Sequence, residues 1–139
     1  MATKRKETKT YSVITPSANL LADPSNESTI SEKDSQLLFG ETFKADDKKK
    51  GWLSGVSLID GYEGQVNETS LAPEKSKPTH VVEKLIAHVY PKPDFKTRPV
   101  LELSFMSRVT IETGTPKNGF VKMPGWGWIY KNNVQKISE

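Results

Sequence analysis

The sequence predicts an all-β fold made of two small barrels in tandem. No segment of ten or more residues has apolar residues at helical spacing. Nine glycines and nine prolines interrupt short apolar runs instead. The order of these runs in the first half is repeated in the second half. Short strands with frequent turns are typical of small barrels and sandwiches.

The first half begins with a charged segment and continues with short apolar runs that stop at Pro, Asn, Asp or Gly. Residues 1–10 lack apolar periodicity, so we expect a disordered basic tail there. The charged run 46–51 is expected to form a turn, and Asp60-Gly61 predicts a tight hairpin. Strands are expected at 11–14, 18–22, 36–40, 42–45, 52–56 and on both sides of the hairpin within 58–66.

The second half starts after residues 74–78, whose Pro, Lys and Glu content is that of a linker. Alternation between apolar and polar residues is clearest at 108–113. The expected strands are 81–82, 85–90, 100–103, 108–113, 119–123 and 126–130. The predicted organisation is therefore a first barrel at 11–73, a linker at 74–78 and a second barrel at 79–139.

An internal repeat supports two barrels rather than one. Residues 18–24 match 87–93, 51–54 match 119–122, and 64–66 match 127–129, in the same order. In both halves a glycine opens the last strand of the pattern, where we expect two backbones to pack closely.

The composition excludes several kinds of site. The chain has no cysteine, which excludes disulfides, thiolate metal ligands and a cysteine nucleophile. His80 and His88 are the only histidines, and their spacing, eight residues apart, does not fit a metal site. We therefore expect no metal and no cofactor. No apolar run approaches the roughly 20 residues that a membrane helix needs, so no membrane partner is expected.

Five stretches of the sequence resemble a known family. Each half resembles a bacterial SH3-like domain, and together the halves resemble the N-terminal tandem SH3-like region of NlpC-type murein peptidases, which cleave γ-D-glutamyl bonds. The resemblance covers about 11–73 and 79–137, and it implies binding of murein peptide. The stretches that carry it are 36–41, 51–52, 60–66, 78–82 and 125–129.

In that family a catalytic domain with a cysteine nucleophile and a histidine base follows the SH3-like region. This sequence has no cysteine. We therefore expect that the chain is not an enzyme by itself. The resemblance makes it the targeting part of a cysteine peptidase, whose catalytic domain would lie in a longer parent chain or in a separate partner.

Asp60 and Tyr62 are candidate ligand contacts on the expected hairpin. Asp60 could pair with a free amine, and Tyr62 could form a flat wall with a hydroxyl group. The resemblance favours this role, because the first SH3-like domain of those peptidases helps to limit the substrate pocket. The alternative is an ordinary turn aspartate beside an ordinary tyrosine.

Trp126, Trp128 and Tyr130 form a candidate aromatic stripe, because residues two apart on a strand face the same side. Such a stripe could stack on a peptide or a glycan. The alternative is that these rings form the core of the second barrel or the interface between barrels. Trp52 and Phe120 occupy matching repeat positions, where a ring would be structural or form the floor of a groove.

The expected partner is a murein peptide or glycan fragment, and a protein–protein adaptor is the first alternative. Nucleic acid is less expected, because the lysines gather in the tail and in one turn, away from Trp126 and Trp128, and the net charge is only +3. The basic N-terminus has no apolar segment behind it, which predicts a cytoplasmic bacterial location.

Overall fold

The computed structural model describes residues 8–26 and 34–137, and this part of the chain is all-β, as predicted. Strands and three short 3-10 helices make up its regular structure, without an α-helix. The chain divides into two compact units. The first unit contains residues up to 37 together with 41–75, and the second contains 38–40 together with the residues from 76 onward.

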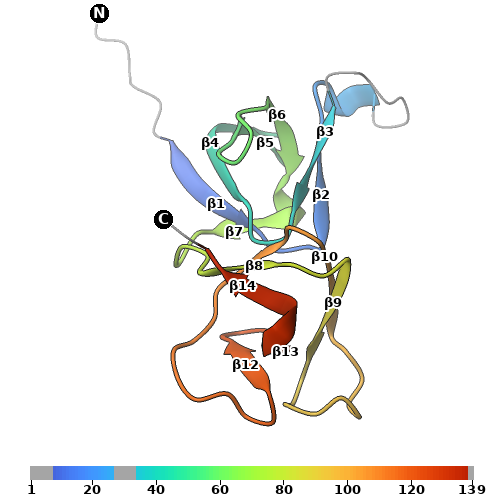
Figure 1. The fold of residues 1–139 in the computed structure, drawn as a ribbon. Helices are drawn as coiled ribbons and strands as arrows, with labels where there is room; N and C mark the ends of the chain where they lie inside the picture. The colour runs from blue at the N-terminus through green and yellow to red at the C-terminus, as the bar shows by residue number, and fades with distance from the viewer. Residues whose placement is uncertain (1–7, 27–33, 138–139) are drawn as a thin grey trace, which may run out of the picture. The chain divides into compact units, whose positions relative to one another are not determined.

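The first unit is built on a five-stranded antiparallel sheet in the order β6-β5-β4-β1-β7 and on a two-stranded ribbon of β2 and β3. Figure 1 shows β1 running between β4 and β7. The strands are β1 (Lys9–Val13), β2 (Ser17–Leu20), β3 (Ser35–Leu38), β4 (Thr42–Lys49), β5 (Trp52–Ser57), β6 (Glu63–Asn67) and β7 (Leu71–Pro73), and the 3-10 helices are η1 (Pro24–Asn26) and η2 (Glu68–Ser70).

Strand β1 starts earlier than the sequence predicts. Lys9 and Thr10 pair with Ala45 and Lys44 of β4, so the end of the expected tail at 1–10 belongs to the sheet. A charged residue such as Lys9 is acceptable here because its side chain is exposed while its backbone pairs with β4. The rest of the expected tail, residues 1–7, lies outside the described part of the chain.

The charged run at 46–51 is mostly strand rather than turn. Strand β4 continues to Lys49, and the chain reverses at Lys50 and Gly51, whose φ angles are 53° and 84°. Two consecutive positive φ values match the tight turn that best suits the twist of a hairpin. The side chains at 46–50 are exposed, so their charge does not conflict with strand structure.

The core of the first unit comes from the inward-facing residues of these strands. Alternation places Phe43 and Ala45 of β4 inside, and Leu53 and Val66 meet them from β5 and β6. The buried cluster consists of Val13, Ala18, Leu20, Leu37, Phe43, Ala45, Leu53, Val66 and Leu71.

The second unit contains a four-stranded sheet in the order β10-β9-β13-β12 and a three-stranded sheet in the order β11-β8-β14. All of its paired strands are antiparallel. The strands are β8 (His80–Val82), β9 (Ile86–Tyr90), β10 (Leu101–Ser104), β11 (Arg108–Val109), β12 (Phe120–Met123), β13 (Gly127–Tyr130) and β14 (Val134–Lys136), with the 3-10 helix η3 (Lys131–Asn133).

Phe39 belongs to the core of the second unit, although the sequence predicts it in a strand of the first half. Strand β3 ends at Leu38, and the next two residues form a turn. The Phe39 carbonyl accepts a hydrogen bond of 2.8 Å from the Arg108 amide. Its ring is buried in a cluster with Val82, Ala87, Val89, Leu103, Val109, Ile111, Met123, Ile129 and Val134.

Two hairpins, one in each unit, have the same register. Trp52 pairs with Asn67 in the β5–β6 hairpin, and Phe120 pairs with Tyr130 in the β12–β13 hairpin. In each case the second strand leads directly into a 3-10 helix and then into a short strand. The structural match therefore aligns Trp52 with Phe120 and Asn67 with Tyr130.

The close backbone approach predicted at two glycines is confirmed. A Cβ atom on Gly64 would lie 2.9 Å from the Leu21 carbonyl oxygen. A Cβ atom on Gly127 would lie 2.3 Å from the Tyr90 carbonyl oxygen. Both glycines are needed because a neighbouring backbone occupies the space that a side chain would take.

We expect His80 of β8 to give the second unit a pH-dependent contribution to stability. Burial lowers the pKa of this imidazole, and Lys136, its cross-strand partner on β14, lowers the pKa further. The unfolded chain, with a histidine pKa of about 6.5, binds the proton more readily than the folded chain. We therefore expect the free energy of unfolding to be highest above pH 6.5 and to fall as the pH drops through the pKa of folded His80.

Urea denaturation between about pH 5 and 7.5 measures this dependence. His80→Gln should flatten the slope, because the variant has no imidazole to titrate. His88→Gln, which leaves His80 in place, should retain it. An unchanged slope in His80→Gln would assign the pH dependence to other groups.

Candidate ligand-binding site

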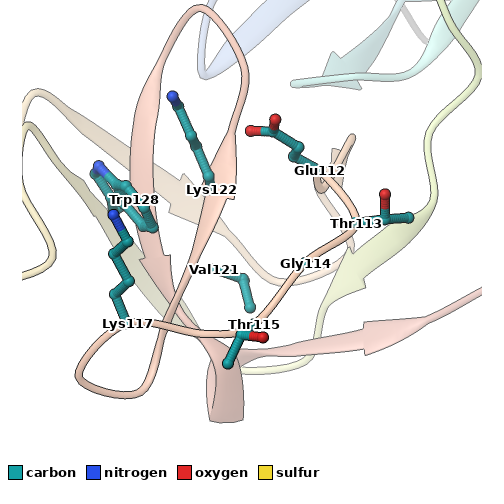
Figure 2. Close-up of a pocket in the computed structure, with 8 residues that line it drawn as sticks. All are labelled: Glu112, Thr113, Gly114, Thr115, Lys117, Val121, Lys122 and Trp128. Carbon is teal, nitrogen blue, oxygen red and sulfur yellow. The ribbon is translucent and has the colours of Figure 1, made fainter.

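A pocket of about 270 Å³ lies in the second unit beside the β12–β13 hairpin. Figure 2 shows the segment 112–115 on one side and Trp128 with Lys117 on the other, with Lys122 between them. The lining residues are Glu112, Thr113, Gly114, Thr115, Lys117, Val121, Lys122 and Trp128.

The hairpin register places Lys122 beside Trp128. The two residues are direct cross-strand partners, so their side chains lie on the same face of the sheet. The alternate residues Met123 and Ile129 point into the core instead. The segment that carries Glu112 is held against β12 by a hydrogen bond of 2.9 Å from the Glu112 amide to the Lys122 carbonyl.

Two ammonium groups flank the Trp128 indole. Lys117 Nζ and Lys122 Nζ each lie 5.8 Å from the ring centroid, which is within the range of a cation–π interaction. Glu112 adds an exposed carboxylate to the same pocket. The site therefore offers two cations, one anion and one aromatic surface. A short peptide that carries both carboxylates and an amine has the matching groups.

Asp60 and Tyr62 belong to the first unit and do not line this pocket. The chain turns between β5 and β6 where the Asp-Gly pair predicts it, but through the loop 58–62 rather than through a two-residue turn. Within this loop Asp60 Oδ1 accepts a hydrogen bond of 3.4 Å from the Tyr62 amide. The Tyr62 side chain is 57% exposed, so it is accessible to a ligand.

The predicted stripe of Trp126, Trp128 and Tyr130 is not continuous. Trp126 lies in the turn 124–126 rather than in the strand, and its ring centroid is 5.0 Å from that of Phe39 in an edge-on contact. Tyr130 packs against Phe95, at 5.1 Å between centroids. The turn takes Trp126 out of the alternation of β13, and of the three rings only Trp128 lines the pocket.

Sequence reasoning missed the charged residues of the pocket. It placed the lysines in the tail and in one turn, away from the tryptophans, whereas Lys117 and Lys122 both lie against Trp128. The number of residues between Lys122 and Trp128 could have revealed this contact. A turn at 124–126 between strands of equal length makes Lys122 the cross-strand partner of Trp128.

Residues 8–26 and 34–137 lack two further kinds of feature. No helix there is long and apolar enough to cross a membrane. The same residues contain no group of three or more histidine, aspartate or glutamate side chains placed to hold a metal ion.

Comparison with known proteins gives a fold rather than a family. No family model matches the chain, and no curated protein matches it. Among solved structures it is similar to an NlpC/P60 family protein from Bacillus cereus, with a TM-score of 0.68 and 17% identity over 94% of this chain and 57% of that one. NlpC2 and NlpC1 from Trichomonas vaginalis match at TM-scores of 0.41 and 0.42, with 15% and 16% identity, over 95% and 96% of this chain and 49% and 48% of theirs.

The likeness to the Bacillus cereus protein overturns the expectation that the chain is not an enzyme. NlpC/P60 proteins are typically cysteine peptidases, so the chain matches part of a protein from a family of enzymes. The sequence itself contains no cysteine, so these 139 residues do not supply the nucleophile of such a peptidase. This chain spans about half the length of the solved structures it matches. What it shares with the Bacillus cereus protein is the NlpC-related fold.

Proposed function

We propose that the protein binds cell-wall peptide and that the pocket around Trp128 holds it. The observation that carries this proposal is the placement of two lysine ammonium groups at 5.8 Å from one indole ring, with the Glu112 carboxylate in the same pocket. The fold shared with an NlpC/P60 protein supports a ligand from the cell wall.

The chemistry of a γ-D-glutamyl peptide suits these groups. A γ-glutamyl bond uses the side-chain carboxyl group of the glutamate, so its α-carboxylate stays free. Lys117 and Lys122 would bind such carboxylates, and Glu112 would bind a free amine. The aliphatic parts of the peptide would lie on the face of Trp128.

Asp60 and Tyr62 remain proposed contacts in the first unit. The exposed Tyr62 ring and the neighbouring Asp60 carboxylate offer a flat surface and an acceptor for an amine. Trp126 and Tyr130 are proposed contacts only through their exposed edges, because each packs against another ring.

An NMR titration with the synthetic tripeptide L-Ala-γ-D-Glu-L-Lys tests the proposal on the full chain. Each tryptophan gives one indole N–H signal, and we expect that of Trp128 to shift saturably. Lys117→Gln and Lys122→Gln should each weaken binding by about 2- to 5-fold, the effect of an exposed ion pair. Lys131→Gln is the matched control, because Lys131 is exposed in the same unit and lies outside the pocket. No shift of the Trp128 signal at about 10 mM peptide, a concentration that detects even millimolar affinity, would refute the proposal.

Single-stranded nucleic acid is the second candidate, because lysines beside a half-buried tryptophan also suit stacked bases and phosphates. Glu112→Gln distinguishes the two candidates, because it should change the affinity for each ligand in the opposite direction. Loss of this carboxylate should weaken binding of a peptide amine but strengthen binding of a polyanion. For an oligo(dT) ligand we would also expect affinity to fall steeply between about 50 and 200 mM salt.

A further inference from the structure

A second pocket, of about 460 Å³, lies in the first unit. It is formed by β2, β5 and β6, whose places are labelled in Figure 1, together with η2. Its volume falls in the range of about 300–1,000 Å³ that is usual for small-molecule sites. The lining residues are Ser17, Ala18, Asn19, Leu21, Trp52, Asn67, Thr69 and Ser70.

Strand alternation brings polar groups together with one indole in this pocket. Leu53 and Val66 point into the core, so their neighbours Trp52 and Asn67 lie on the opposite, outer face. Trp52 and Asn67 are direct cross-strand partners. Asn19 on β2 is exposed between two buried residues, which places it on the outer face as well.

The polar groups around Trp52 are held in place by the chain. Asn67 caps η2, and its Oδ1 atom accepts hydrogen bonds from the Thr69 amide at 3.0 Å and the Thr69 hydroxyl at 2.8 Å. These two bonds fix the carboxamide group. The Asn67 NH2 group is thereby left as a donor, and the Thr69 hydroxyl oxygen as an acceptor.

The second unit shows that the matching outer face accepts a flat ring. There the aligned residues Phe120 and Tyr130 are covered by Phe95, with ring centroids 4.6 Å and 5.1 Å away. In the first unit the aligned residues are Trp52 and Asn67, and the corresponding place is a polar pocket instead.

We infer that the pocket beside Trp52 binds an uncharged sugar. None of the eight lining residues is charged, in contrast to the pocket beside Trp128. The indole offers an apolar face for the C–H groups of a pyranose ring, and the amides and hydroxyls match its hydroxyl groups as donors and acceptors. This inference stands on the first unit alone and does not depend on the peptide pocket.

The test is a titration of the full chain, labelled at its tryptophan nitrogens, with N,N′,N″-triacetylchitotriose and with cellotriose. We expect the Trp52 indole signal to shift saturably with at least one of these sugars, with a dissociation constant in the millimolar range. The signals of Trp126 and Trp128 should stay in place. No movement of the Trp52 signal at about 20 mM of either sugar, or movement of the Trp128 signal alone, would overturn the inference.

Variants locate the contacts. Trp52→Leu should abolish the binding, and Trp52→Phe should retain part of it because a flat ring remains. Asn19→Ala should weaken binding by about 3- to 10-fold, the effect of one hydrogen bond. This variant stays informative even if the replacements of Trp52 disturb the folding of the first unit. Asn132→Ala is the matched control, because Asn132 is exposed and outside the pocket. Equal affinity of Asn19→Ala and Asn132→Ala would contradict the assignment.

Discussion

Replacing Phe39 by alanine is expected to lower the free energy of unfolding of the second unit by about 3–5 kcal/mol, as for other buried aromatic residues. The Phe39 side chain is only 4% exposed and packs within the core cluster of that unit. Its loss would also remove the edge contact with Trp126. Urea denaturation followed at the amide signal of Ile129, a core residue of the same unit, measures the effect.

Phe105→Ala is the matched control for this prediction. Phe105 is a phenylalanine of the second unit with 48% of its surface exposed, so its replacement should cost less than about 1 kcal/mol. A comparable loss in both variants would mean that the segment 38–40 contributes no specific packing. A large loss in Phe39→Ala alone would show that the second unit depends on a tripeptide from the first half of the sequence.

The placement of Phe39 illustrates what the sequence determines and what it leaves open. The apolar residues Leu37, Leu38 and Phe39 favour burial, because such side chains are the ones most often found inside a protein. They do not say which core receives the ring. Gly40 could have given a hint, since its φ of 80° and the Arg108 carbonyl oxygen, 1.8 Å from where a Cβ would lie, both require glycine. That contact joins positions far apart in the chain, which local periodicity does not report.

The all-β fold and several turns could be predicted from the sequence, because they depend on residues that are close together in the chain. Asp60-Gly61 predicts the β5–β6 reversal, and the glycines at 64 and 127 predict close backbone contacts. The residues at which strands end were harder to predict. The charged residues 46–49 look like a turn in sequence, yet residues 47–49 pair with β5, and Asp46 lies at an irregularity in that pairing. Charged side chains do not prevent this pairing, because they are exposed while the backbone forms the hydrogen bonds.

The candidate site was predicted only in part, because a pocket depends on register between strands. Trp128 was named from the sequence, but Lys122 becomes its neighbour only once the β12–β13 pairing is known. Trp126 was expected to share the face of Trp128. The turn at 124–126, with Gly125 at a φ of 81°, directs it toward Phe39 instead.

Replacing Gly127 by alanine is expected to be the most damaging small change near the Trp128 pocket. The new Cβ atom would lie 2.3 Å from the Tyr90 carbonyl oxygen, and Gly127 has a φ of 150°, which an alanine rarely adopts. Strain of this kind and overpacking each cost about 1–3 kcal/mol, so we expect a loss of about 3 kcal/mol or more in urea denaturation. Trp128, the next residue, should move relative to Lys122, and the tripeptide titration should weaken accordingly.

Gly125→Ala separates the steric cause from the conformational one. Gly125 also has a positive φ, of 81°, but nothing lies within 4 Å of where its Cβ would be. This variant should therefore lose only about 1–2 kcal/mol, the cost of the left-handed conformation, and should keep its peptide affinity. If both variants lost the same stability, the contact between Gly127 and the Tyr90 backbone would not be what holds β13 against β9. A larger loss in Gly127→Ala, accompanied by a shift of the Trp128 indole signal, would show that this backbone contact positions the indole that we propose binds the peptide.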